Sequence, residues 1–279
     1  MKCLQCPKHC NIDRTARKGF CGESDKLRVA KIIENFKWEE PCISGNKGAL
    51  AIFFSGCNLR CNFCQNYEIS HKGKGKEYTP QGFRELLESY DMSKYDSLDL
   101  VTPTQFSLQL VDTFHGYNKT LPIVFNSNGY ESEETIRKVA EFADVFLVDL
   151  KFYDKELSTR LAGAPNYFEV ASKAVKLMSK LKPNRFKNGI LTQGVLIRHL
   201  ILPGQVRDSI RLLDYIKAEI ETPFVSIMSQ FTPIGKGELK RKITPLEFKT
   251  VLAHAEKLGL DNGYFQDLDS ANECFIPKF

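Results

Sequence analysis

The sequence predicts an α/β protein, a partial (β/α)6 barrel of the TIM type with a small cysteine-rich, metal-binding extension at its amino terminus. From residue 49 onward, short apolar runs alternate with amphipathic stretches of helical periodicity. Before that point the chain is polar and shows no alternation of strand-like and helix-like patterns. It carries four cysteines within its first 21 residues. We therefore expect two units, a metal-binding extension over residues 1–45 and the barrel over residues 46–279.

The strands are predicted from six apolar runs. The first, Ala49–Phe54, is uninterrupted and stops at Ser55-Gly56, which is typical of a strand buried on both faces. The five later runs have the same character: Ser97–Val101, Ile123–Asn126, Val145–Leu150, Val195–Leu202 and Phe224–Ser229.

The helices are predicted from the stretches between these runs, where apolar residues recur at helical spacing: Phe83–Tyr90, Phe106–Tyr117, Glu133–Phe142, Tyr167–Leu181 and Arg207–Ile220. A last helix should begin at Pro245, after the N-cap residue Thr244, and reach about Leu258. Strands that alternate with helices imply parallel βαβ units with right-handed crossovers. Six such units fit an incomplete barrel better than a closed eightfold one.

Composition and charge narrow the class of partner. The 279 residues carry 39 Lys and Arg against 34 Asp and Glu, and this charge of +5 is spread along the chain, which argues against nucleic-acid binding. No apolar run approaches the roughly 20 residues that cross a bilayer. The start of the chain, Met1–Pro7, lacks the apolar stretch of a secretory signal. We therefore expect a cytoplasmic protein with no membrane partner.

The nine cysteines are the chemically informative residues. Seven of them fall in two tight clusters, whereas Cys42 and Cys274 are isolated. In a reducing compartment, closely spaced thiols indicate metal or redox chemistry rather than disulfides.

Cys57, Cys61 and Cys64 have the spacing C-x3-C-x2-C directly after the first predicted strand. Thiolates suit iron–sulfur clusters and zinc. A cubane cluster usually takes four thiolates, so three would leave one iron open for a small molecule. The carboxyl end of a barrel strand is also where this architecture places active sites. These cysteines are therefore the predicted catalytic residues and cluster ligands; a zinc knuckle with a fourth ligand such as His71 is the alternative.

The stretch Ser55–Asn66, with an aromatic Phe63 before the last cysteine, resembles the signature of the radical S-adenosylmethionine (SAM) superfamily. It is similar in particular to pyruvate formate-lyase activating enzyme and its stand-alone relatives with a cysteine-rich amino terminus. The resemblance runs from about Ala49 to the end of the chain. It implies a [4Fe–4S] cluster and SAM as cofactors, and reductive cleavage of SAM to methionine and a 5′-deoxyadenosyl radical that abstracts hydrogen.

The same resemblance implies an oxidoreductase and its partners. These are a protein or small molecule that donates hydrogen and a low-potential reductant such as flavodoxin or ferredoxin. In its sharpest form, the implied function is an activase that installs a glycyl radical on another enzyme.

Further cofactor contacts are implied at later strand ends. Asn126, Ser127 and Asn128 precede Gly129 and resemble the family's Asp-Thr-Asn-Gly. Asp149 and Lys151 match its Asp-x-Lys, with Lys151 expected to pair with the SAM carboxylate. Arg198 lies in a segment that resembles the family's fifth strand and is a candidate for contact with cofactor or substrate. Phe63 completes this implied set.

Two departures from the family pattern bear on function. Thr102-Pro103-Thr104 replaces the Gly-Gly-Glu that holds the SAM amino group, and the hydroxyls of Thr102 and Thr104 can accept that hydrogen bond without a charge. Phe231-Thr232 replaces the Tyr-His of glycyl-radical activases. Radical chemistry is still expected, but the activase role is left open.

The amino-terminal cluster supplies four thiolates, Cys3, Cys6, Cys10 and Cys21, at short spacing. Four soft ligands suit either tetrahedral zinc or a second iron–sulfur cluster. Because such a site has no open position, it suggests a structural role or electron relay.

A function from another class is a non-catalytic zinc-binding protein in which both clusters are structural. An iron–sulfur electron-transfer protein is a further alternative, although a carrier gains nothing from an exposed iron. Metal content separates the enzyme from the zinc-binding alternative: about three or more irons per chain would exclude that alternative, whereas zinc alone without sulfide would support it.

Overall fold

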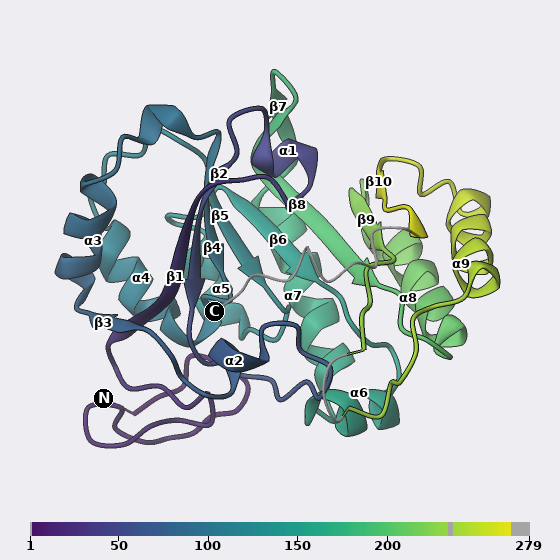
Figure 1. Ribbon diagram of the computed structural model, residues 1–279, viewed down its shortest axis with the longest axis horizontal. Helices are drawn as coiled ribbons and strands as arrows, with labels where there is room; N and C mark the ends of the chain where they lie inside the picture. The colour runs from purple at the N-terminus through teal and green to yellow at the C-terminus, as the bar shows by residue number, and fades with distance from the viewer. Residues whose placement is uncertain (1, 234–236, 269–279) are drawn as a thin grey trace.

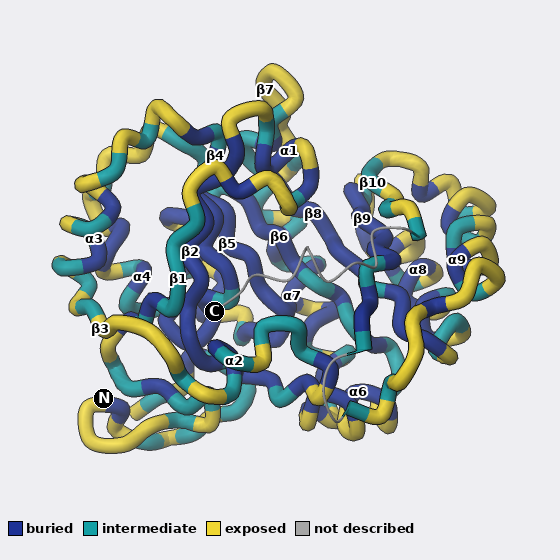
Figure 2. Tube along the Cα trace, viewed as in Figure 1, coloured by how far each residue is buried: buried dark blue, intermediate teal, exposed yellow. Residues whose placement is uncertain are grey.

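The computed structural model describes residues 2–233 and 237–268, so Cys274 lies outside the described residues. Within them, one curved sheet runs through the buried centre of the molecule and helices cover its outer face (Figures 1 and 2). The strands follow the order β10-β9-β8-β6-β5-β4-β2-β1-β3, with the short β7 paired only to β8. The sheet does not close on itself, which confirms the predicted partial barrel.

All six predicted strands are present. They form the parallel series β2 (Ala49–Phe54), β4 (Ser97–Val101), β5 (Ile123–Ser127), β6 (Val145–Asp149), β8 (Ile190–Leu200) and β9 (Val225–Met228). Four more strands were not predicted: β1 (Leu27–Phe36), β3 (Lys76–Tyr78), β7 (Arg185–Lys187) and β10 (Gly263–Phe265).

The predicted helices are also present, as α3 (Pro80–Glu88), α4 (Ser107–Phe114), α5 (Glu133–Val139), α7 (Tyr167–Leu181), α8 (Val206–Glu219) and α9 (Pro245–Lys257). The structure adds α1 (Pro41–Ser44), α2 (Tyr67–Ser70), α6 (Lys155–Ala162) and two short 3₁₀ turns, Met92–Lys94 and Thr104–Phe106. Thr244 is the N-cap of helix α9, as predicted. The structure adds a capping box, in which the Thr244 hydroxyl accepts from the Glu247 N–H and the Glu247 carboxylate accepts from the Thr244 N–H. Among the described residues, no helix combines the length and apolar character needed to cross a bilayer.

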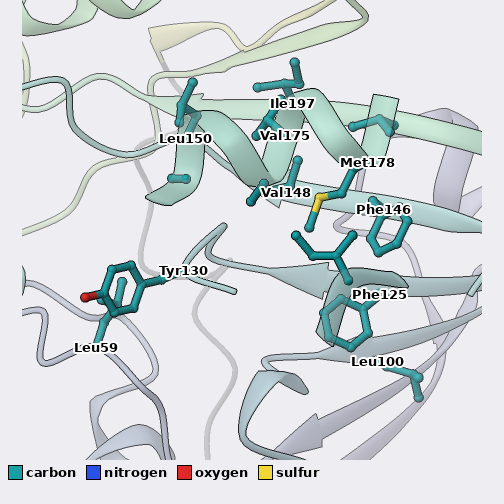
Figure 3. Close-up of a cluster of buried hydrophobic side chains, with 14 of the residues drawn as sticks. Leu59, Leu100, Phe125, Tyr130, Phe146, Val148, Leu150, Val175, Met178 and Ile197 are labelled. Atoms are coloured by element: carbon teal, nitrogen blue, oxygen red, sulfur yellow. The ribbon is translucent and has the colours of Figure 1, made fainter. Parts of the chain in front are cut away.

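The core lies between the sheet and its helices. Val175 and Met178 of α7 lie beside Phe146 and Val148 of β6 and Ile197 of β8 (Figure 3). The inner parallel strands read as continuous apolar runs because both of their faces are covered.

Strand β1 shows that part of the predicted amino-terminal extension belongs to the main sheet. It pairs antiparallel with β2, from Val29 beside Phe54 to Phe36 beside Ala49, so residues 27–36 belong to the main sheet. The chain then turns into α1 at the amino ends of the parallel strands, where the Ser97 hydroxyl donates to the Ile43 carbonyl at 2.7 Å. The irregular part of the extension is confined to residues 2–26, which lie near α2 at the opposite end of the barrel (Figure 1).

Candidate active site

A cavity of about 460 Å³ occupies the inside of the open barrel. At the carboxyl ends of the strands it is lined by the cysteine loop, and at the amino ends by the turn between β1 and α1. All the residues predicted to bind the cluster or SAM, except Thr104, line it: Cys57, Cys61, Phe63, Cys64, Thr102, Asn126, Ser127, Asn128, Asp149, Lys151 and Arg198. The four cysteines of the predicted second metal site, Cys3, Cys6, Cys10 and Cys21, are not among the lining residues. A second depression, of about 520 Å³, lies between α6 and α8 and includes none of them.

Thr102 and Thr104 separate in the structure. Thr102 lines the cavity at the end of β4 and has a φ of +58°, which is costly for a β-branched residue and is a kind of strain that clusters at functional sites. Thr104 is fully buried and its hydroxyl donates to the Glu131 carboxylate at 2.6 Å. The structure thus places Thr104 behind the cavity wall rather than in it.

The cysteine loop is held in place by backbone contacts. Gly56 leaves β2 with a φ of +75° and its N–H donates to the Ile69 carbonyl. Further along, the N–H groups of Arg60 and Asn62 donate to carbonyls at the end of α6, at 3.0 and 2.9 Å. The loop is therefore fixed at both its start and its middle, with three thiols toward one space.

Polar groups surround two of these sulfurs. The Cys57 Sγ accepts hydrogen bonds from the Leu59 N–H and from the Asn128 side-chain amide, each at 3.4 Å. The Ser70 hydroxyl lies 3.3 Å from the Cys64 Sγ. Hydrogen bonds of this kind stabilise a thiolate or a sulfur bound to metal, because they meet the negative charge on sulfur.

Burial and charge act oppositely on the three thiols. Burial raises the pKa of Cys57 to about 11 and also raises the pKa of Cys61 and of Cys64. The charge of Lys151 lowers the pKa of all three. A metal ion or cluster would complete the deprotonation, because a coordinating thiol binds as the thiolate.

Asp149 and Lys151 form a charged pair beside the cysteines. The Lys151 Nζ lies 2.6 Å from one Asp149 oxygen, and the Arg198 Nε lies 2.9 Å from the other. Burial alone would raise the pKa of Asp149, but the two cations outweigh it and the pKa is lowered. Asp149 therefore stays ionised and orients both cations.

Comparison with known proteins identifies the family to which the chain belongs. Residues 51–216, more than half of the chain, match the family model of the radical SAM superfamily. The chain belongs to the radical SAM superfamily. Membership implies a [4Fe–4S] cluster, SAM and a reductant partner.

Two uncharacterized proteins of Methanocaldococcus jannaschii are similar over most of the radical SAM chain. One is 29% identical over 276 residues, covering 93% of this chain and 75% of the relative. The other is 24% identical over 289 residues, covering 94% and 79%.

Three solved structures are similar to this chain at low sequence identity, and the first of them supports the fold alone. A spore photoproduct lyase mutant has a TM-score of 0.50 at 11% identity, covering 76% of this chain and 74% of the lyase. Methylornithine synthase has a TM-score of 0.48 at 17% identity, covering 78% and 70%. A domain of a pyruvate-formate lyase-activating enzyme from Bacteroides vulgatus has a TM-score of 0.40 at 11% identity, covering 67% and 91%.

The cysteine loop is compatible with a radical SAM cluster. Within residues 2–233 and 237–268, no group of three or more His, Cys, Asp or Glu side chains is placed to hold one metal ion, and this holds for the four amino-terminal cysteines as well as for the cysteine loop. In a cubane each thiolate binds a different iron, so the sulfurs must face a common space but need not converge on one point. Cys57, Cys61 and Cys64 meet this requirement because all three line the cavity.

His71, the suggested fourth ligand of a zinc knuckle, is engaged elsewhere. Its Nδ1 lies 2.8 Å from the Ser70 hydroxyl, and its ring stacks on Tyr67 with centroids 4.4 Å apart. His199 is likewise a packed residue, since its two ring nitrogens lie within 2.9 Å of the Leu150 carbonyl and the Ser209 hydroxyl. Burial lowers the pKa of His199 to about 4, so its ring stays neutral.

Several residues of the radical SAM site were missed by the sequence analysis. Tyr167 is fully buried, and its hydroxyl lies 2.8 Å from the carbonyls of Asn128 and Asp149, joining the ends of β5 and β6. Further cavity-lining residues come from β1–α1, β9 and β10: Phe36, Trp38, Glu39, Glu40, Ser226, Met228, Gln230, Tyr264 and Gln266. The sequence contains one signal for this wall, the adjacent acids Glu39 and Glu40 before Pro41. Pro41 indicates the start of a helix, and both carboxylates would lie at that helix start, at one end of the sheet.

The amino-terminal cysteines lie close to the cysteine loop. A methyl group added to Gly56 would lie 2.7 Å from the Cys21 carbonyl oxygen, so the two segments pack directly. Arg60 bridges them, since it donates to the carbonyls of Phe20 and Cys57 and its guanidinium lies 4.7 Å from the Phe20 ring centroid. The radical SAM loop and the four-cysteine segment therefore share one end of the barrel.

Proposed function

We propose that this protein binds a [4Fe–4S] cluster through Cys57, Cys61 and Cys64 and reductively cleaves SAM. The observation that carries this proposal is the shared cavity, in which three thiols face Lys151 and the polar ends of β5 and β6. In the cytoplasm, a low-potential reductant such as flavodoxin or ferredoxin would supply the electron.

A cluster held by Cys57, Cys61 and Cys64 would supply the one electron needed for cleavage of a sulfonium C–S bond of SAM, for which the products would be methionine and a 5′-deoxyadenosyl radical able to take a hydrogen atom from the substrate. The chain's own residues bind and orient. Lys151, held by Asp149 at 2.6 Å, would pair with the SAM carboxylate. Asn126, Ser127 and Thr102 line the cavity and would offer hydrogen-bonding groups to SAM, with the Asn126 amide already bonded to Arg198 and Glu39.

Phe63 forms an apolar wall. Its ring packs on Phe152 and Phe231, with both centroid distances 6.1 Å, which shields the cysteine loop from water. Phe231 stands where glycyl-radical activases have a polar pair. The activase form of the function therefore rests on the resemblance of the cysteine loop alone.

An anaerobic assay tests the proposal. Reconstituted protein is mixed with dithionite and SAM, and 5′-deoxyadenosine is quantified for the wild type, Cys61→Ala and Cys42→Ala. Cys42 is buried outside the cluster loop and serves as the matched control. We expect product from the wild type and Cys42→Ala but not from Cys61→Ala. Product from all three, or zinc as the sole metal, would contradict the proposal.

We also propose that Cys3, Cys6, Cys10 and Cys21 bind a second metal centre, either zinc or iron–sulfur. A methyl group on Gly19 would lie 3.4 Å from the Cys21 Sγ and 3.6 Å from the Cys10 Sγ, so both sulfurs flank a glycine that leaves them room. The Phe20 N–H donates to the Cys10 Sγ at 3.2 Å. Burial, with a smaller effect of the other three cysteines, raises the pKa of Cys6 to about 12.

The test uses a variant in which Cys57, Cys61 and Cys64 are all alanine. Retained iron with sulfide would identify a second iron–sulfur cluster, and zinc without sulfide a structural zinc site. A variant that binds neither metal while it remains folded would overturn this second proposal.

A further inference from the structure

The turn between β1 and α1 forms a cavity wall opposite the cysteine loop. Trp38, Glu39, Glu40 and Pro41 line the cavity there. Since β1 runs antiparallel to β2 and its end at Phe36 lies beside Ala49, this wall stands at the amino ends of the parallel strands. It is therefore separated along the barrel from the loop that would hold SAM.

Glu39 and Arg198 form a buried ion pair. The Arg198 Nη1 lies 2.5 Å from Glu39, its Nη2 donates to the Asn126 side-chain oxygen at 2.7 Å, and its Nε pairs with Asp149. Every nitrogen of the guanidinium thus has an acceptor. Asn126 in turn donates to Glu39 at 3.2 Å.

Within the part of the chain that the structure describes, Glu40 lacks such a hydrogen-bonded partner at one of its carboxylate oxygens. Its side chain is 92% buried, yet its Oε2 has no hydrogen-bond donor among the described residues. The cation beside it is the Arg198 Nη1, at 3.9 Å, which is already used by Glu39. A buried carboxylate oxygen without a donor is costly, so a ligand that brings a donor to this point would be stabilised.

The charge of the cavity favours a cationic ligand. The buried network holds two cations, Lys151 and Arg198. Against them stand the carboxyl groups Glu39, Glu40, Asp99 and Asp149. Burial, with Glu39 adding to it, raises the pKa of Asp99 well above its usual range, and burial also raises the pKa of Glu39. The network therefore contains four acidic side chains and two basic ones.

Aromatic rings flank the carboxylates. Trp38, which is 44% exposed, packs against Phe36 with ring centroids 5.3 Å apart, and Phe36 meets Phe53 edge to face at 5.6 Å. All three residues line the cavity. An aromatic face beside a carboxylate attracts an ammonium group through both the ring quadrupole and the charge.

We propose that the wall formed by Trp38 and Glu40 binds an alkylammonium group, so that the hydrogen donor of the radical reaction is a small-molecule amine. As a statement about the substrate, this rests on the proposed function. The ammonium would donate to the Glu40 Oε2 and contact the Trp38 ring. The rest of the molecule would then extend along the cavity toward the cysteine loop.

Trp38 provides the measurement, because it is the only tryptophan of the chain. Cluster-loaded protein is titrated with n-butylammonium, n-butanol and butyrate while Trp38 fluorescence is recorded. We expect a saturable change with n-butylammonium alone, and at least tenfold weaker binding in Glu40→Gln. Glu133→Gln, an exposed acid on α5, should bind as the wild type does.

A second variant guards against a folding defect in Glu40→Gln. Trp38→Leu removes the aromatic face at a partly exposed position, and calorimetry should show severalfold weaker n-butylammonium binding. Equal responses to the amine and the alcohol, or unchanged affinity in both variants, would overturn the inference.

The outcome is separable from that of the proposed function. Ammonium-selective binding without any 5′-deoxyadenosine would leave the binding wall standing and reject the radical chemistry. Formation of 5′-deoxyadenosine in a protein that does not distinguish n-butylammonium from n-butanol would do the reverse.

Discussion

The two ends of the barrel cavity differ in how their residues are supplied. At the carboxyl end, the cysteine loop, Asn128, Asp149 and Lys151 follow directly on parallel strands. At the amino end, Trp38, Glu39 and Glu40 come from the turn between one antiparallel strand and a four-residue helix. The first end matches the radical SAM family, whereas the second belongs to a part of the chain before the matched residues 51–216.

This difference suggests that the two ends of the cavity have different functions. An activity common to the superfamily would be located where the strands of the shared fold end. Selection of a particular substrate would be located where this chain has added its own wall. Variants that affect one end and not the other can test that division.

Arg198 touches both ends, and its loss should have the largest effect. Arg198→Met leaves Glu39 and Asp149 buried without their guanidinium, so we expect the free energy of unfolding to fall by about 3–5 kcal/mol. Urea denaturation measures this, with the exposed Arg137→Met as control. A loss equal to that of the control would show that the two ends are not coupled through Arg198.

Lys151 belongs to the carboxyl end alone. Lys151→Met should raise the KM for SAM roughly a hundredfold, because it leaves the SAM carboxylate and Asp149 without their cation. The affinity for n-butylammonium should change less than threefold. Steady-state assays and calorimetry compare these effects, with the exposed Lys155→Met as control. If the binding of SAM and the binding of n-butylammonium are weakened to the same extent, the two ends of the cavity do not act separately.

Glu131 makes the carboxyl end sensitive to pH. Burial raises its pKa to about 7 from an ordinary value of 4.5, and its Oε2 has no hydrogen-bond partner among the described residues. A raised carboxyl pKa means that stability is full at low pH and is lost as pH rises through the folded-state value. Between about pH 5 and pH 8 the wild type should lose at most about 3 kcal/mol of unfolding free energy through this group.

Glu131→Gln should remove that dependence, whereas the exposed Glu133→Gln should retain it. Urea denaturation at a series of pH values gives the comparison. A wild-type profile with the same slope as that of Glu131→Gln would contradict the assignment.

The contact between the amino-terminal segment and the cysteine loop should have the smallest effect. Gly56→Ala would place a methyl 2.5 Å from the Glu23 side chain, at a φ of +75°. Gly116→Ala has a similar φ of +67°, but no described atom lies within 4 Å of its added methyl. We expect Gly56→Ala to cost about 1–2 kcal/mol more than Gly116→Ala, the difference being the steric clash. Equal costs by thermal denaturation would mean that the two segments do not pack as described.

The sequence allowed the parallel half of the fold to be predicted well. Each parallel strand is an apolar run buried on both faces, and each helix has an amphipathic pattern, so local signals and tertiary structure agree. Asp149 and Lys151 could be placed on one face because side chains two residues apart in a strand point the same way.

The opposite wall could not be predicted from local signals. Strand β1 is of mixed character, with Lys31 and Glu34 among its apolar residues, and it lies between β2 and the edge strand β3. The pairing of Glu39 with Arg198 joins residues 159 positions apart. Thr104 shows the same limit, since whether its hydroxyl faces the cavity or Glu131 depends on the backbone turn at Thr102.

The measurement that tests the central claim most directly is electron paramagnetic resonance of the reduced protein with and without SAM. The account predicts a [4Fe–4S]⁺ signal that depends on Cys57, Cys61 and Cys64. It further predicts that this signal changes when SAM is added, with a hyperfine coupling from ¹⁵N in the SAM amino group. A cluster signal that saturating SAM leaves unchanged, or a reduced protein with no cluster signal, would contradict an open iron at this site.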